Sequence, residues 1–327
     1  MTTYGPDTTT EEVLQGHDLT GRHFMVTGAS SGLGEESSRA LAQAGATVTM
    51  LARDPKKLEN AIDRIKSSNP SANLNTGIAD LSDQRSIRNY AEEFLATGAS
   101  IDVLINNAGV MVCPFSKTAD GIEMQFGTNH IGHFLLTNLL LPVILIGDNP
   151  RIVNLSSAGH THSDVNLDDP NFEESEYNAW ESYGRSKSAN IHFTQEIVRR
   201  YGDRIQSFAV HPGVILTELG RHLTPDLMNE MTERVKSRSS SSSEAKKTGA
   251  LPFKSIQAGA ATQVWAAITE DLKEHNGAYL GDCQIGIEGG NPSESGYLPY
   301  IFNRKTAEAL WVLGEDLVNQ KFPKEIL

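Results

Sequence analysis

The chain has 327 residues, of which 39% are hydrophobic and 21% charged, a composition that allows a substantial buried core. Its formal net charge of −13 indicates an acidic surface and argues against general nucleic-acid binding. The two cysteines, Cys113 and Cys283, are too few for a disulfide framework, so we expect a reducing compartment and a cytoplasmic location.

The chain contains no segment that we interpret as a targeting or membrane signal. Residues 1–13 are polar and acidic and lack the pattern of a signal peptide. The most apolar run, residues 134–146, contains Asn138 and Pro142 and is too short to cross a bilayer. We interpret it as a buried helix and expect no transmembrane segment.

Strand-like and helix-like segments alternate along most of the chain. We predict strands at residues 23–27, 47–51, 73–78, 101–106, 151–155, 205–210 and 277–280. We predict helices at residues 35–44, 55–67, 82–95, 121–146 and 183–201. Since no linker separates these units, we expect a single α/β domain over residues 1–327. Its fold would be a Rossmann-type, doubly wound parallel sheet with helices on both faces.

Two stretches interrupt this alternation. Residues 160–181 are polar and acidic, and we interpret them as an inserted loop. Residues 219–252 include a serine run at 237–243 that is broken by one arginine. This second stretch is either a flexible surface loop or a mobile lid over a substrate, and its place after a strand of the predicted site favours the lid.

A glycine-rich turn lies between the first predicted strand and helix. The sequence at 27–34 is Thr-Gly-Ala-Ser-Ser-Gly-Leu-Gly. Glycines allow the backbone to approach a pyrophosphate, and the helix that follows directs its free N–H groups toward the anion. We therefore predict dinucleotide binding by Gly28, Ser30, Ser31, Gly32, Leu33 and Gly34.

The end of the second strand bears on the choice of cofactor. Arg53 could pair with a ribose 2′-phosphate, which favours NADP over NAD. Asp54 follows directly and is of the opposite charge. The alternative, in which Arg53 is only a solvated surface charge, leaves NAD possible.

Tyr183 and Lys187 are four residues apart on a predicted helix and therefore share one of its faces. A phenol has a pKa of about 10 and is a poor base at neutral pH. A nearby ammonium group favours the phenolate, so the tyrosine could exchange a proton with an alcohol or a ketone. Ser156 and Ser157 end the fifth strand, where a hydroxyl can hold a substrate oxygen or simply satisfy backbone groups.

Together these motifs resemble the short-chain dehydrogenase/reductase superfamily. Further matches are Asp80-Leu81, the Asn-Asn-Ala-Gly sequence at 106–109, Asn129, and His211-Pro212-Gly213 followed by Thr217. The stretches at 51–54, 129–134, 182–187 and 281–283 are most similar to the retinol-dehydrogenase-like and WW-domain-oxidoreductase-like branch.

The resemblance implies a role for each matching residue. Tyr183 would be the acid/base, Lys187 would bind the nicotinamide ribose and lower the pKa of the tyrosine, and Ser157 would hold the substrate oxygen. Asn129 would position a water molecule in a proton relay behind Lys187. The remaining expected cofactor contacts are Tyr183 itself, Asp80, Leu81, Asn107, Ala108, Gly109, Pro212, Gly213 and Thr217.

We accordingly expect an NADP-dependent enzyme that interconverts an alcohol and a ketone or aldehyde, with a small and partly apolar substrate. One alternative is a nucleotide-binding regulator without catalysis, and another is a reductase of a different bond type, such as an enone. The resemblance also implies a homodimer or homotetramer. The histidine pairs His130/His133 and His160/His162 lack the further ligands of a metal site, so we expect no metal.

Overall fold

The computed structural model describes residues 4–238 and 253–323. Within them an eight-stranded sheet has the order β3-β2-β1-β4-β5-β6-β7-β8, in which all neighbours pair in parallel except β8, which is antiparallel to β7. The strands are β1 (His23–Thr27), β2 (Thr47–Ala52), β3 (Asn73–Ile78), β4 (Val103–Asn106), β5 (Arg151–Leu155), β6 (Gln206–His211), β7 (Tyr279–Gly281) and β8 (Gln284–Ile285). This arrangement confirms the predicted Rossmann-type fold.

The strand order reverses at β1, which lies between β2 and β4. Met25 of β1 is paired with Thr49 on one side and with Leu104 on the other. All three side chains are buried, because helices cover both faces of the sheet. In a doubly wound sheet, the point of reversal leaves a crevice at the carboxyl ends of the strands, where ligands bind.

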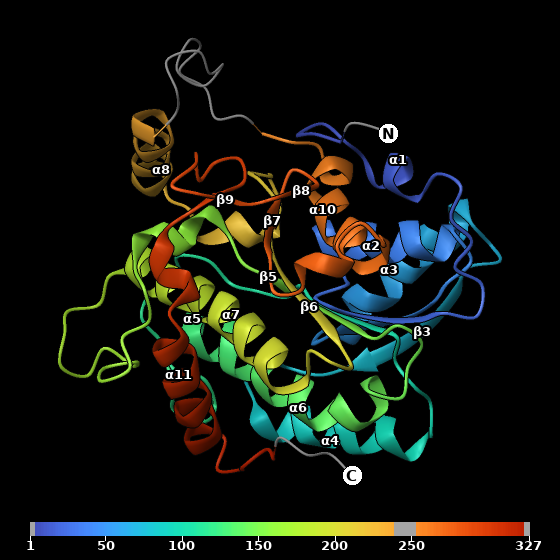
Figure 1. Cartoon of the computed structure of the whole chain (residues 1–327), viewed down its shortest axis with the longest axis horizontal. Coiled ribbons are helices and arrows are strands. Elements are labelled where there is room, and N and C mark those ends of the chain that lie inside the picture. The colour runs from blue at the N-terminus through green and yellow to red at the C-terminus, as the bar shows by residue number, and fades with distance from the viewer. Residues whose placement is uncertain (1–3, 239–252, 324–327) are drawn as a thin grey trace.

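Two hydrophobic clusters fill the space between the sheet and its two helical layers. One cluster includes residues of α2 (Gly32–Gln43), α3 (Pro55–Ser68) and α10 (Ile256–Ile268). The other includes residues of α4 (Gln84–Ala96), α6 (Gly132–Ile144), α7 (Ala179–Tyr201) and α11 (Arg304–Leu317). Figure 1 shows α10 beside α2, and α11 beside α7.

The single helix predicted at 121–146 is wrong in one respect. The structure has a short helix α5 (Met124–Phe126), a π-helical turn (Gly127–Ile131) and then α6. A π turn inserts an extra residue into the helix and is often found at functional sites. Asn129 lies in this turn and is fully buried.

The two irregular stretches contain more regular structure than the sequence indicated. Helix α7 already begins at Ala179, and a 3₁₀ helix occupies Ala158–His162, so the irregular loop is confined to residues 163–178. The predicted lid contains a 3₁₀ helix (Glu218–His222) and the helix α8 (Pro225–Arg238). In Figure 1, α8 lies at the edge of the molecule, away from the sheet. The serine run from residue 239 onward lies outside the described residues.

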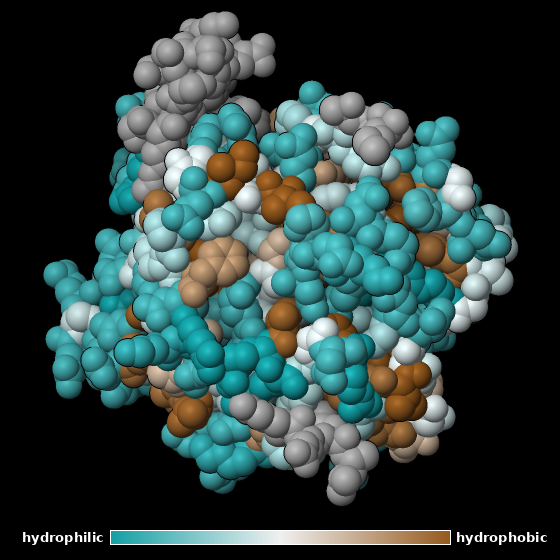
Figure 2. Space-filling view, in the orientation of Figure 1, coloured by the Kyte–Doolittle hydropathy of each residue, from teal (hydrophilic) through white to brown (hydrophobic). Residues whose placement is uncertain are grey.

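The termini add elements that the sequence analysis did not predict. They are α1 (Thr10–Leu14), a small parallel pair of β9 (Ile287–Glu288) with β10 (Gly296–Tyr297), a 3₁₀ helix (Pro299–Phe302) and α11. No helix in residues 4–238 and 253–323 has the length and apolar character needed to cross a membrane. On the face seen in Figure 2, exposed hydrophobic residues form small separate groups among hydrophilic ones.

Trp311 attaches α11 to the rest of the molecule. Its ring lies 5.1 Å from that of Phe134 on α6 and 5.9 Å from that of Phe193 on α7, and the Arg200 guanidinium lies 4.0 Å above it. Its indole N–H donates to Glu315 at 3.0 Å. The aromatic contacts and the cation–π contact together fix the C-terminal helix across α6 and α7.

We predict that Trp311→Ala lowers the free energy of unfolding by about 3–5 kcal/mol, because a large buried ring is replaced by a cavity. Urea denaturation of the full chain measures this change. The neighbouring Val312, 49% exposed on the same helix, gives the matched control, and Val312→Ala should change stability by less than about 0.5 kcal/mol. Equal losses in the two variants would contradict the assigned packing.

Candidate active site

A cavity of about 430 Å³ opens at the carboxyl ends of strands β1 to β6. Its walls come from the loops that follow these strands, together with α7 and part of the predicted lid. Of the residues predicted for the site, all line this cavity except Gly34 and Asn129: Gly28, Ser30, Ser31, Gly32, Leu33, Arg53, Asp80, Leu81, Asn107, Ala108, Gly109, Ser157, Tyr183, Lys187, Pro212, Gly213 and Thr217.

The glycine turn between β1 and α2 forms one wall. Gly28 and Gly32 have φ values of +65° and +57°, which side chains other than glycine rarely adopt. A Cβ on Gly28 would lie 2.8 Å from the Ala108 Cα. The Thr27 hydroxyl accepts hydrogen bonds from the backbone N–H groups of Asn107 (2.9 Å) and Ala108 (3.0 Å), so this turn and the loop after β4 are fixed to each other.

The first turn of α2 fits the phosphates of a dinucleotide. Ser31 is its N-cap residue, but its hydroxyl forms no capping hydrogen bond with the helix. The first N–H groups of a helix have no partner within the helix, and here they adjoin the cavity. Gly34 lies against the turn itself, since a Cβ there would lie 2.4 Å from the Gly28 carbonyl oxygen.

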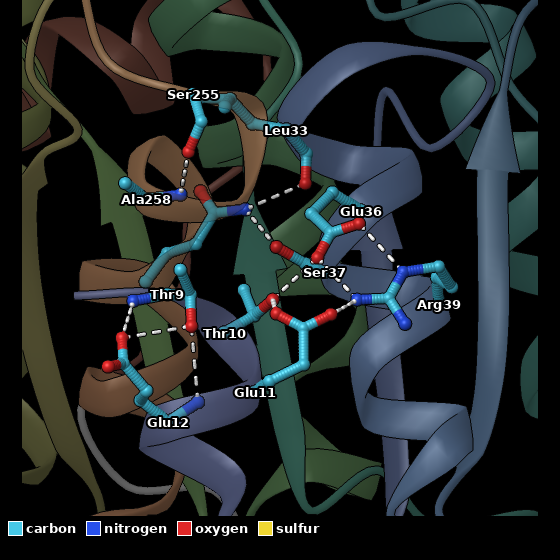
Figure 3. Close-up of polar contacts among 11 residues, drawn as sticks. Thr9, Thr10, Glu11, Glu12, Leu33, Glu36, Ser37, Arg39, Ser255 and Ala258 are labelled. Atoms are coloured by element: carbon cyan, nitrogen blue, oxygen red, sulfur yellow. Dashed lines mark hydrogen bonds and ion pairs between the residues drawn. The ribbon is translucent and has the colours of Figure 1, made fainter. Parts of the chain in front are cut away.

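Helix α2 is held in place by α1 and α10, as Figure 3 shows. On the α10 side, Gln263 Nε2 donates to the Leu33 carbonyl and to the Ser37 hydroxyl. On the α1 side, the Thr10 hydroxyl donates to the buried carboxylate of Glu36, which also pairs with Arg39. The helix that follows the glycine turn is therefore supported by α1 near the N-terminus and by α10, which lies more than 200 residues later in the chain.

At the far end of the cavity, two cations flank the predicted adenosine site. Arg53 is exposed there, and Lys57, which the sequence analysis did not single out, also lines the cavity. The Asp54 carboxylate caps α3, accepting from the N–H groups of Lys56 (2.9 Å) and Lys57 (3.0 Å). The sequence signal for Lys57 was the pair of lysines Lys56-Lys57 that follows Arg53 at the start of a helix.

The Tyr183 ring and the Lys187 ammonium lie together on the buried face of α7. The ammonium nitrogen is 5.6 Å from the centre of the ring and donates to the Leu155 carbonyl at 3.1 Å. Burial raises the pKa of the Tyr183 phenol to about 12, an effect that the Ser157 hydroxyl opposes. Burial also lowers the pKa of Lys187 to about 8.

Ser157 and the residues after it face Tyr183. A Cβ on Gly159 would lie 2.6 Å from the Tyr183 ring, so only glycine leaves room for the phenol here. The Ser157 hydroxyl accepts from the Gly159 N–H at 3.0 Å. The Ser156 hydroxyl is directed elsewhere and donates to the Lys187 carbonyl at 2.9 Å. The two serines at this strand end thus make different contacts.

Asn129 lies behind this group and outside the cavity wall. Its side-chain amide donates to the Val110 carbonyl and to the Ser186 hydroxyl, both at 2.9 Å, and its oxygen accepts from the Val110 N–H at 2.8 Å. The side chain thus connects the loop after β4 to α7. Its backbone carbonyl accepts from Nδ1 of His133, whose Nε2 contacts Thr27.

The part of the cavity beyond Tyr183 is lined by residues that the sequence analysis left out or mentioned only in passing. Trp180 stacks on His162, with ring centres 5.1 Å apart, and Arg234 of α8 contacts His162 Nδ1 at 2.9 Å. The remaining lining residues here include Met111, Leu219, Leu223, Met228, Met231, Phe253, Pro292 and Ser293. The three-residue spacing of Met228 and Met231 in the sequence indicates that they share one face of a helix. No pattern in the sequence indicates that Pro292 and Ser293 line a cavity.

The histidines weighed as metal ligands contact protein groups. His130 Nδ1 lies 3.2 Å from the Asn190 side-chain oxygen, and His160 contacts the backbone of Ser157. Among the described residues, no three or more His, Cys, Asp or Glu side chains form a group that could hold a metal ion.

Comparisons with known proteins identify the family. The family model described as short chain dehydrogenase matches residues 22–227. Retinol dehydrogenase 12 of Mus musculus is 38% identical over 301 residues, which cover 92% of this chain and 87% of that protein. Short-chain dehydrogenase/reductase prx1 of Penicillium roqueforti is 38% identical over 306 residues, covering 90% of this chain and 84% of that one.

Solved structures agree with these matches. The crystal structure of an uncharacterized protein from Mycobacterium Paratuberculosis is 31% identical and superposes with a TM-score of 0.72, covering 97% of this chain and 99% of that chain. RhlG of Pseudomonas aeruginosa, at 22% identity and a TM-score of 0.60 over 80% of this chain and 95% of its own, shares the fold. The chain belongs to the short-chain dehydrogenase/reductase family, oxidoreductases that use NAD or NADP, which confirms the resemblance seen in its sequence.

We predict that Gly34→Ala weakens binding of a nicotinamide dinucleotide by about tenfold or more, because the added methyl group would push α2 away from the phosphate turn, and overpacking of this kind costs about 1–3 kcal/mol. Fluorescence titration with the reduced coenzyme measures the affinity. Gly5, around which a Cβ would meet no atom within 4 Å, gives the control Gly5→Ala. Unchanged binding by the Gly34 variant would contradict the proposed support of the turn.

Proposed function

We propose that this protein is an NADP-dependent oxidoreductase that interconverts an alcohol and a ketone or aldehyde. The observation that carries this proposal is the common cavity. The buried pair Tyr183 and Lys187 lines it together with Ser157, and the same cavity continues to the glycine turn and to Arg53. A regulator that only binds a nucleotide has no chemical need for a buried phenol and ammonium beside a substrate space.

The bound coenzyme would be held by the glycine turn, by Lys187 and by the residues after β3, β4 and β6. Its nicotinamide would supply or accept the hydride. In our proposal Ser157 donates a hydrogen bond to the substrate oxygen and holds it next to the phenol. Tyr183 gives a proton to that oxygen during carbonyl reduction and removes it during alcohol oxidation.

The environment of Tyr183 sets the pKa of its phenol, and therefore the pH at which it can donate or accept a proton. In the chain alone, burial raises the pKa of its phenol to about 12, so the protonated form prevails at neutral pH, as carbonyl reduction requires. Oxidation requires the phenolate, which the charge of Lys187 favours. We therefore expect alcohol oxidation to accelerate as pH rises and carbonyl reduction to slow.

The preference for NADP rests on Arg53 and Lys57. Both cations line the end of the cavity, where a ribose 2′-phosphate would lie. One oxygen of the nearby Asp54 carboxylate, Oδ1, accepts from two N–H groups at the start of α3, which directs this carboxylate toward the helix. Lys57 contacts Glu218 at 2.9 Å on an exposed surface, an ion pair weak enough to be exchanged for a phosphate.

A partly apolar substrate is the best fit to the remaining space. Beyond Tyr183 the wall is formed mainly by Trp180, leucines and the methionines of α8. Such flexible, polarizable side chains adapt to large apolar ligands. The similarity to retinol dehydrogenases supports the same class of substrate. In this proposal the 3₁₀ helix Glu218–His222 and α8 form the described part of the lid predicted at 219–252, and residues 239–252 lie outside the described residues.

We predict that Tyr183→Phe reduces kcat by about 10²–10⁴-fold while coenzyme affinity stays unchanged, because only the proton-transferring group is lost. Steady-state kinetics with NADPH and a panel of ketones, aldehydes and enones measures this and identifies the bond reduced. Tyr90→Phe is the control, since Tyr90 is buried, does not line the cavity, and places its hydroxyl 3.9 Å from the Met25 sulfur. Full turnover by the Tyr183 variant would exclude the proposed acid/base.

We predict that Arg53→Ala weakens NADPH binding by about tenfold or more and leaves NADH binding unchanged, because a charge-assisted contact to the 2′-phosphate contributes about 1.5–3 kcal/mol. Lys57→Ala should act in the same direction. Lys56, whose side chain is 75% exposed and pairs with Glu59, lies outside the cavity and provides the control Lys56→Ala. Equal losses for NADPH and NADH would identify Arg53 as a general surface charge.

A further inference from the structure

His160 lies immediately behind the active site and plays no part in the chemistry proposed above. It belongs to the 3₁₀ helix Ala158–His162, is fully buried, and does not line the cavity. Both of its ring nitrogens meet backbone groups. Nδ1 lies 2.7 Å from the Ser157 carbonyl oxygen, and Nε2 accepts from the Leu298 N–H at 3.3 Å.

These two contacts define the protonation of the ring. A backbone N–H can only donate, so Nε2 accepts and carries no proton. A carbonyl oxygen can only accept, so Nδ1 carries the proton and donates. His160 is therefore a neutral imidazole in the Nδ1–H form. It joins Ser157, which follows the end of β5, to Leu298, 138 positions after His160 in the chain.

The C-terminal segment also holds the backbone of His160. The Tyr300 hydroxyl, from the 3₁₀ helix Pro299–Phe302, donates to the His160 carbonyl, to which the Ser188 hydroxyl of α7 donates at 3.2 Å. The Tyr279 ring packs edge-on against the imidazole, with ring centres 5.3 Å apart. The imidazole is thus enclosed between β7, α7 and the C-terminal segment.

We propose that His160 is a positioning residue for the catalytic serine, and that its Nδ1–H sets the place of the Ser157 hydroxyl through the Ser157 peptide. The proposal rests on the proposed function, in which that hydroxyl holds the substrate oxygen. Ser157 follows the end of β5 and its hydroxyl already accepts from the Gly159 N–H, so its remaining freedom is that of its own peptide plane. Two backbone groups hold this plane in part: the His160 N–H donates to the Ser157 carbonyl at 3.0 Å, and the Ala158 N–H donates to His211 Nδ1 at 3.1 Å. Nδ1–H of His160 adds a second donor to the Ser157 carbonyl, from a side chain. A displacement of about 1 Å in such a group can reduce turnover by about 10²-fold.

Two substitutions of His160 separate the contact of Nδ1 with Ser157 from the contact of Nε2 with Leu298. In His160→Asn, the side-chain amide can take the place of Nδ1–H and donate to the Ser157 carbonyl, while the contact with Leu298 is lost. In His160→Gln, the longer side chain can reach Leu298, while the donor at the Nδ1 position is lost. We expect His160→Asn to keep kcat within about threefold of the wild type and His160→Gln to lose about tenfold or more, with KM for NADPH unchanged in both.

A purely structural role predicts a different result. His192 is a buried histidine on α7 that contacts Asp164 at 2.8 Å, and His192→Gln serves as the matched control. It should lower the melting temperature but leave kcat per folded molecule unchanged. Equal kcat in the Asn and Gln variants of His160, after correction for the folded fraction, would overturn the proposal. Tyr300→Phe, which keeps the imidazole, should lower kcat in the same direction by a smaller factor.

A measurement without turnover tests the geometry directly, and either of the two His160 variants that folds is sufficient to assign the signal. Long-range ¹H–¹⁵N spectra of the histidine-labelled wild-type chain distinguish the two neutral tautomers, and the signal that disappears in His160→Asn or His160→Gln assigns the residue. The Nδ1–H form is expected, and an Nε2–H or doubly protonated ring would overturn the inference. A correct tautomer together with no turnover of any carbonyl substrate would instead refute the proposed function.

Discussion

The buried ammonium group of Lys187 requires polar partners in the protein interior, and the surrounding structure supplies them. A charge of this kind is costly to remove from water, and its lowered pKa reflects that cost. Its protein partner is the Leu155 carbonyl, to which the Asn190 amide also donates, at 2.9 Å. The carbonyl that ends β5 therefore serves two donors. His130 lies behind Asn190 and aligns its amide, so a polar layer extends through the otherwise apolar space between α6 and α7.

Asn129 extends this layer toward the cavity. It fixes the backbone of Val110 and the hydroxyl of Ser186, which in turn donates to the Tyr183 carbonyl at 2.8 Å. The π turn accounts for its orientation, since one extra residue in a helix changes the direction in which the following side chains point. The residues that surround the phenol and the ammonium are thus held by hydrogen bonds that are themselves buried.

The sequence predicted the sheet and the cavity residues well because both depend on local signals. Alternation of apolar segments predicted β1 to β7, and glycines and polar strand ends predicted the cavity walls. The π turn could not be foreseen, because the stretch 121–146 has a helical pattern throughout. The roles of His160 and Trp311 depend on segments far apart in the chain, which no local pattern reports. Arg53 and Asp54 gave opposite indications about the cofactor in the sequence, and the structure adds that Asp54 caps α3.

The attachment of α11 has a consequence for how copies of this chain could associate. The helix covers the aromatic side chains of Phe134 and Phe193, so the outer surface of α6 and α7 is already occupied from within the same molecule. Assembly through these two helices would have to use the outer face of α11 instead, where Val312 is exposed. A chain shortened before Arg304 would present those aromatic rings to solvent. Such a shortened chain would keep all the proposed catalytic groups but would lose activity by associating with other copies through the exposed rings.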